Sequence, residues 1–129
     1  MDQARARFYS DAVSYLGVIG DEGARVSQTM AGDGSTLAGI EVVLRSAKST
    51  ENSRYDNCSS SRASGGIPNG LGDIAENADE VHRRFQKAMN ECLRGITDSN
   101  GEQIIAGGQA LKSSATLAST TVMKINAQR

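Results

Sequence analysis

Apolar residues recur every three or four positions in four stretches of the chain, which is the spacing of one face of an α-helix. The first stripe predicts a helix over residues 3–31, and a shorter stripe predicts a second helix over residues 36–48. The first stripe consists of Phe8, Ala12, Tyr15, Ile19, Gly23, Val26 and Met30, and the second of Leu37, Ile40, Val43, Leu44 and Ala47. Glycines weaken a helix, so we expect a kink or break in the first one near Gly20.

The C-terminal half carries the strongest helical pattern. Two stripes run through more than three heptads each and predict helices over residues 73–97 and 101–127, joined by a tight polar turn. The stripes are Leu71, Ile74, Ala78, Val81, Phe85, Ala88, Cys92 and Ile96, followed by Ile104, Gly108, Leu111, Ala115, Ala118, Val122 and Ile125. Two matched arms of this kind are typical of an antiparallel helical hairpin.

The middle of the chain, "STENSRYDNCSSSRASGGIPNG" at residues 49–70, is rich in Ser, Asn and Gly and holds the only proline. It shows no apolar periodicity, so we expect a flexible loop or linker there. The sequence therefore predicts a single all-α domain over residues 1–129. Its helical hairpins form a bundle with a Ser/Gly-rich central loop.

Charge and hydropathy argue against nucleic acid and membranes as partners. Lys and Arg total 14 and Asp and Glu total 15, so the net charge is -1 and gives no bulk attraction for nucleic acid. No apolar run approaches the length of a membrane span. No cleavable signal peptide is visible, so we expect synthesis in the cytoplasm, with export only by a route that needs none. Cys58 and Cys92 are free thiols in the reading we favour, although one disulfide would also fit two cysteines.

Candidate catalytic groups are sparse, and the sequence predicts no enzyme, no cofactor and no metal. His82 is the only histidine and lies three residues after Asp79, which we interpret as a weak surface pair. Glu76, Asp79 and Glu80 cluster near the start of a helix, where acidic residues are favoured. A small metal-binding or enzymatic bundle is the alternative that these residues leave open.

The last helix is built almost entirely from small residues, which let helix backbones approach closely. It carries no charge between Lys112 and Lys124, so we expect it to be buried on more than one face. Helix–helix association is the favoured interpretation, and a packed helix of a monomer is the other. The expected association surface is Leu111, Ala115, Ala118, Val122 and Ile125, with Ile74, Val81 and Phe85 opposite.

The ending "TVMKINAQR" at residues 121–129, after a Gly/Ala-rich helix start, resembles the tails of small ESX-related proteins of actinobacteria. The two-arm layout is also similar to the WXG-type helical hairpins of ESX, or type VII, secretion systems. The resemblance implies a non-enzymatic, secreted or secretion-associated protein that pairs with itself or a related helical protein. A filament, needle or inner-rod subunit of a secretion apparatus is the second hypothesis.

Overall fold

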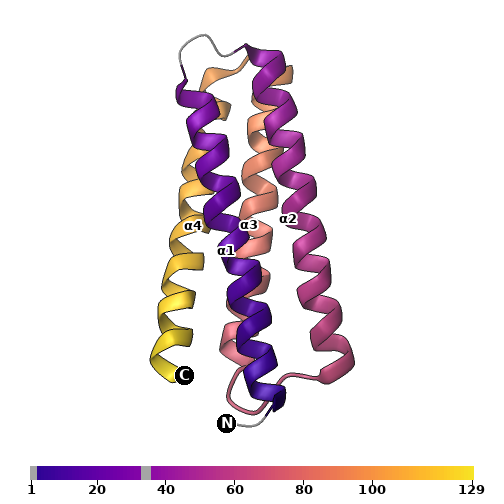
Figure 1. The fold of residues 1–129 in the computed structure, drawn as a ribbon. Coiled ribbons are helices and arrows are strands. Elements are labelled where there is room, and N and C mark those ends of the chain that lie inside the picture. Colours follow the sequence, from indigo (N-terminus) through magenta and orange to yellow (C-terminus); the bar gives the residue numbers. More distant parts are fainter. Residues whose placement is uncertain (1–2, 33–35) are drawn as a thin grey trace.

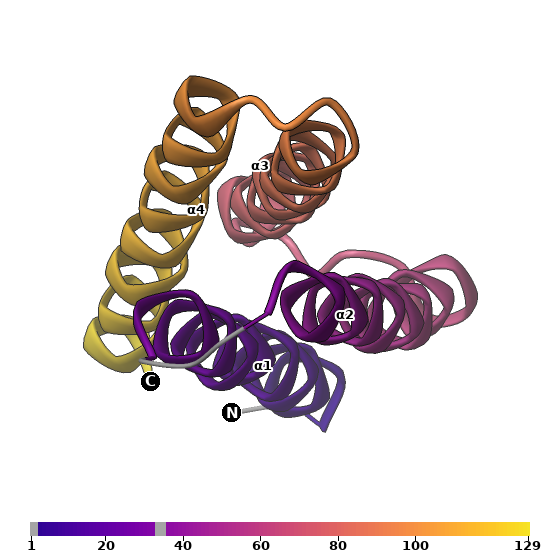
Figure 2. The same ribbon diagram turned by 90° about the horizontal axis from the view of Figure 1, so that it is seen from above.

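In the computed structural model, four helices run up and down in turn and form an antiparallel bundle (Figure 1). The structure describes residues 3–32 and 36–129. The helices are α1 (Gln3–Ala31), α2 (Leu37–Gly65), α3 (Gly72–Thr97) and α4 (Gly101–Gln128), and the described residues contain no strand. Seen from above, α1 lies beside α2 and α4, and α3 lies beside the same two helices across the core (Figure 2). The all-α bundle predicted from the sequence is therefore confirmed.

Helices α1 and α3 follow their predicted stripes closely. Six of the seven residues in the first stripe are buried, and Met30 at its end is half-buried. In α3 every residue of the predicted stripe is buried except Ile96, which is half-buried. Helix α1 continues through Gly20 without the expected break: Gly17 and Gly20 lie on its exposed side, while the large side chains of the stripe anchor the helix in the core.

Helix α2 corrects the prediction for the middle of the chain. The sequence predicted a helix over residues 36–48 and a flexible loop over 49–70, but the helix continues to Gly65. Thr36 caps its start by accepting a hydrogen bond from the Gly39 amide at 3.0 Å, and Gly66 ends it with a φ of 75°. The loop prediction failed because this part of α2 turns polar side chains toward the core, so its seam carries no apolar pattern.

Helix α4 has the predicted bounds to within a residue, but its buried face is shifted. The sequence assigned Gly108, Ala115 and Val122 to this face, and all three are only half-buried. The residues that are buried follow a regular four–three spacing: Gly107, Leu111, Ser114, Ala118, Thr121 and Ile125. Small residues suit this face because α4 packs directly against α3, and the Ser114 hydroxyl meets its polar need by donating to the Val81 carbonyl at 3.1 Å.

Candidate functional site

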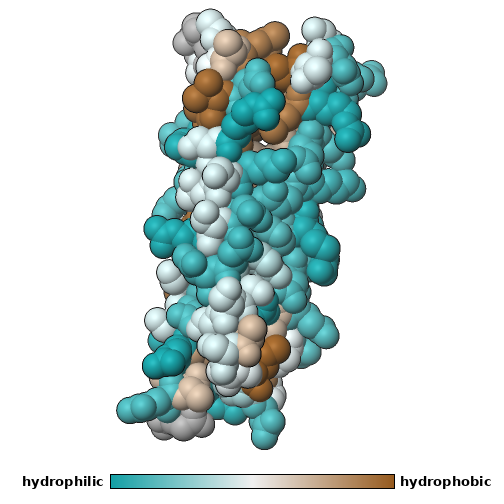
Figure 3. Space-filling model, turned by 90° about the vertical axis from the view of Figure 1, so that its right-hand side faces the viewer, coloured by the Kyte–Doolittle hydropathy of each residue, from teal (hydrophilic) through white to brown (hydrophobic). Residues whose placement is uncertain are grey.

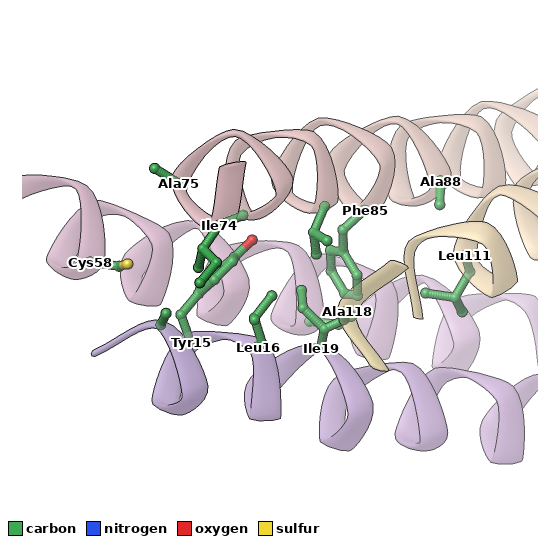
Figure 4. Packing of buried hydrophobic residues seen from close by; sticks show 14 of the residues in the cluster. Tyr15, Leu16, Ile19, Cys58, Ile74, Ala75, Phe85, Ala88, Leu111 and Ala118 are labelled. Carbon is green, nitrogen blue, oxygen red and sulfur yellow. The ribbon is translucent and has the colours of Figure 1, made fainter. Parts of the chain in front are cut away.

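The eight residues predicted to form an association surface lie mainly inside the bundle. Six of them are buried between the chain's own helices: Ile74, Val81, Phe85, Leu111, Ala118 and Ile125. Ala115 and Val122 are half-buried on α4. Figure 4 shows Phe85 and Ala88 of α3 and Leu111 and Ala118 of α4 within this core. In the folded chain the six buried residues hold the bundle together and are not free to contact a partner.

The most distinctive interior feature is a line of polar residues on α2, here called the polar seam: Glu51, Tyr55, Cys58 and Arg62. Glu51 is 0% exposed, and its carboxylate accepts hydrogen bonds from Tyr15 Oη at 2.6 Å and Gln86 Nε2 at 2.7 Å. The Nδ1 atom of His82 lies 2.8 Å from the same carboxylate. A buried carboxylate is tolerated only where donors of this kind replace water.

The second part of the polar seam binds Asp79 of α3. Tyr55 Oη donates to Asp79 Oδ1 at 2.8 Å, and Arg62 Nη2 donates to the same oxygen at 2.7 Å. The Tyr55 ring stacks on the His82 imidazole, with 3.7 Å between ring centroids and 6° between planes. The two halves of the seam are therefore joined by the Tyr55–His82 stack.

Burial and the acidic residues shape the titration of this region. Burial, reinforced by the Glu51 charge, raises the pKa of Tyr15 far above its usual range. Burial and the hydrogen bond to Asp79 raise the pKa of Tyr55. Burial lowers the pKa of Arg62, but its hydrogen bond to Asp79 outweighs this and raises the pKa overall. Both phenols therefore remain donors near neutral pH, and Arg62 remains a cation.

The sequence predicted the wrong partner for His82. His82 pairs with Glu51 of α2, while Asp79 binds Tyr55 and Arg62. The available signal was the heptad spacing, because Glu51 and Cys58 lie four and eleven positions after the buried Ala47. Hydrophobicity alone misses such positions, since a seam residue can be polar when its partners satisfy it.

Both cysteines are free and buried, in agreement with the favoured prediction. Cys92 packs in α3 against α4, and burial raises its pKa to about 11. Cys58, which was expected in a loop, lies in α2, and burial raises the pKa of its thiol as well. Neither thiol is therefore primed to act as a nucleophile near neutral pH.

Apolar side chains are exposed at the end of the bundle that carries the α1–α2 and α3–α4 connections. Every helix contributes to this region, which we call the apolar end: Leu37 and Ile105 are exposed, and Met30, Ile40 and Ile96 are half-buried against the core. Leu37 is 54% exposed and Ile105 is 64% exposed. Figure 3 shows hydrophobic side chains gathered at this end and a smaller group at the opposite end, whereas the long middle of the viewed face is mostly polar. Grouped apolar exposure of this kind is typical of contact surfaces.

Comparison of the chain with protein-family models, with curated proteins and with solved structures gave no match. Within residues 3–32 and 36–129, no group of three or more His, Cys, Asp or Glu side chains is placed to hold a metal ion. None of the helices in the described part of the chain is long and apolar enough to cross a membrane.

Proposed function

We propose that this protein acts without catalysis, by helix–helix association through its apolar end. Its partner is a second copy of the chain or a related helical protein. The observation that carries this proposal is the exposure of Leu37 and Ile105 at an end to which all four helices contribute apolar residues. Together with the resemblance of the tail, it supports a role as an ESX, or type VII, secretion-related factor.

The energetics favour an association that is specific but modest. Complete burial of a Leu or Ile side chain is worth about 1.5–3 kcal/mol. Leu37 and Ile105 are each a little more than half exposed, so covering them contributes about 1 kcal/mol apiece. Two copies that meet through the same end bury four such side chains, and the two-fold arrangement closes the assembly as a dimer.

The test is the mass of the protein in solution, measured by sedimentation as a function of concentration. We expect a dimer for the unmodified chain, and Leu37→Lys and Ile105→Lys each to weaken it at least tenfold. The matched control is Ile67→Lys, which places the same charge at the opposite end of the bundle, where Ile67 is 48% exposed. A chain that remains monomeric at high concentration, or a dimer indifferent to both substitutions, would refute the proposal.

The second candidate is a rod or filament subunit, and the exposure of Ile67 at the far end favours it. If the apolar end of one copy meets the Ile67 end of the next, the contact is head-to-tail and does not close. Long assemblies that Leu37→Lys and Ile67→Lys both abolish would establish this alternative in place of the dimer. Neighbouring reading frames that encode a type VII secretion ATPase or a paired hairpin protein would support the secretion-related assignment, and rod or needle components would contradict it.

A further inference from the structure

A cavity of about 70 Å³ lies between α1, α2 and α3 at the end of the bundle opposite the apolar end. It forms where the first half of α1, the last turns of α2 and the start of α3 meet. Cys58 of α2 and Ile74 and Ala75 of α3 lie together at this place in Figure 4. The association proposed above does not use this cavity, and the two ideas stand or fall separately.

The cavity exists because the three helices present small side chains to one another. Ala12, Ala75 and Ala78 line it, and Phe8 and Ile74 complete an apolar interior. An engineered apolar cavity of about 150 Å³ holds benzene, so a cavity of this volume accepts roughly three or four carbon atoms. The interior therefore suits a short alkyl group rather than a ring or a long chain.

The charges around the lining balance, because Asp79 pairs with Arg62 and Asp11 offsets Arg7, and Arg7 is the cation that faces solvent. Arg7 and Arg62 contribute two cations and Asp11 one anion. Asp11 accepts a hydrogen bond from Ser61 at 2.7 Å, and Arg62 is held by Asp79, whereas exposed Arg7 makes no ion pair within the described residues. Ala4 of α1 and Ile74 and Ala75 of α3 belong to the first turns of their helices, where the helix dipole also favours an anion.

We propose that this cavity binds a short-chain monocarboxylate, with the alkyl tail among Ala12, Ala75 and Ala78 and the carboxylate at Arg7. The choice of ligand follows from two properties: an interior sized for a few carbons, and a cation at its mouth that has no ion pair among residues 3–32 and 36–129. The tail displaces no hydrogen-bonded group from the apolar floor. Affinity is therefore expected to rise with chain length until the cavity is full and then to level off.

The test uses the full-length protein with acetate, butyrate, pentanoate and octanoate, and with pentanol as the uncharged match of pentanoate. Binding is followed by amide shifts in NMR spectra and by the rate at which Cys58 is alkylated, with peptide mapping to separate it from Cys92. We expect saturable binding that strengthens up to pentanoate, gains little with octanoate and is weaker for pentanol. Bound pentanoate should slow the alkylation of Cys58 and leave that of Cys92 unchanged.

Two variants separate the contributions of the tail and the charge. Ala78→Leu adds three carbons to the cavity and should abolish binding of both pentanoate and pentanol. Arg7→Gln, at an exposed position that the fold does not need, should weaken pentanoate roughly two- to fivefold and leave pentanol unchanged. Arg54→Gln on the exposed face of α2 is the control and should change neither.

Three results would overturn the proposal. They are the lack of saturable binding by any carboxylate, equal affinity of the unmodified protein for pentanol and pentanoate, and unchanged pentanoate binding by Arg7→Gln. None of the three needs a substitution inside the core, so the proposal remains falsifiable if Ala78→Leu fails to fold.

Discussion

Two adjacent glycines of α4 should respond to the same substitution with opposite signs. A Cβ atom added at Gly107 would collide with Cys92 Sγ and would lie 2.9 Å from Cys92 N and 3.1 Å from the Ala88 carbonyl oxygen. Non-bonded contacts to carbon are best at about 3.5–4.0 Å, so alanine there requires α4 to move away from α3. At Gly108 the same atom meets nothing within 4 Å.

The magnitude follows from two opposing contributions. Overpacking a buried position costs about 1–3 kcal/mol, and we expect the upper end because two of the three contacts at Gly107 are to backbone atoms. Replacing a helical glycine by alanine returns about 1 kcal/mol at either position. Gly107→Ala should therefore lower the free energy of unfolding by about 2 kcal/mol, and Gly108→Ala should raise it by up to about 1 kcal/mol.

Urea unfolding followed by circular dichroism measures both changes. For a chain of this size, each kcal/mol corresponds to roughly 3–5 °C in melting temperature. The slope of the free energy against urea should match the unmodified protein in both variants, since the surface exposed on unfolding is the same. If Gly107→Ala stabilises the protein as much as Gly108→Ala, then α4 does not approach the α3 backbone as closely as described.

Two further predictions concern buried groups that the bundle keeps from water. Glu51→Ala should lower the free energy of unfolding by about 3–5 kcal/mol, because it leaves three interior donors without their acceptor, whereas Glu41→Ala at an exposed ion pair should cost less than about 1 kcal/mol; similar losses in urea unfolding would contradict this. Burial, aided by Glu91, raises the pKa of Cys92 from 9.0 to about 11. The folded state therefore favours the neutral thiol, which adds about 3 kcal/mol to the free energy of unfolding. This contribution is complete below pH 9 and is lost as the pH rises to 11. Stability measured from pH 8 to 11 should thus fall less steeply in Cys92→Ala than in the unmodified protein, and parallel curves would contradict the assignment.

Hydrophobic periodicity was sufficient for α1 and α3 because nearly every seam position in these helices is apolar. Ile19, Val81 and Phe85 are each 0% exposed, and all three were placed in the core by spacing alone. In such helices the buried positions are occupied by apolar residues, so only one face of the helix can bury all the large side chains. The bounds of both helices could be predicted to within about one residue for the same reason.

In α4 the pattern allowed two neighbouring frames, and hydrophobicity chose the wrong one. The predicted frame used Ala115 and Val122, which are more apolar than the Ser114 and Thr121 of the observed frame. Two factors that hydropathy does not measure decide the outcome, namely the closeness of α3 and the hydroxyl bonds to backbone carbonyls. Ser114 donates to Val81 O, and Thr121 donates to Leu117 O at 2.6 Å. Both frames have four–three spacing and share Leu111, Ala118 and Ile125, so spacing alone could not separate them.

The polar seam of α2 explains the failed loop prediction. It also accounts for the alignment of α2 along its neighbours, which an apolar seam would define less well. If α2 slid along its neighbours by one heptad, Leu44 would replace Glu51 and leave Tyr15 and Gln86 without an acceptor. Glu51 would then occupy the place of Cys58, in the cavity that Asp11 also lines. Both changes are unfavourable, because unsatisfied buried donors and neighbouring like charges each cost free energy. Seams of small residues, such as that of α4, discriminate weakly between registers, so we infer that the directional bonds of Glu51 fix the alignment of the bundle. That alignment in turn determines which side chains reach the apolar end.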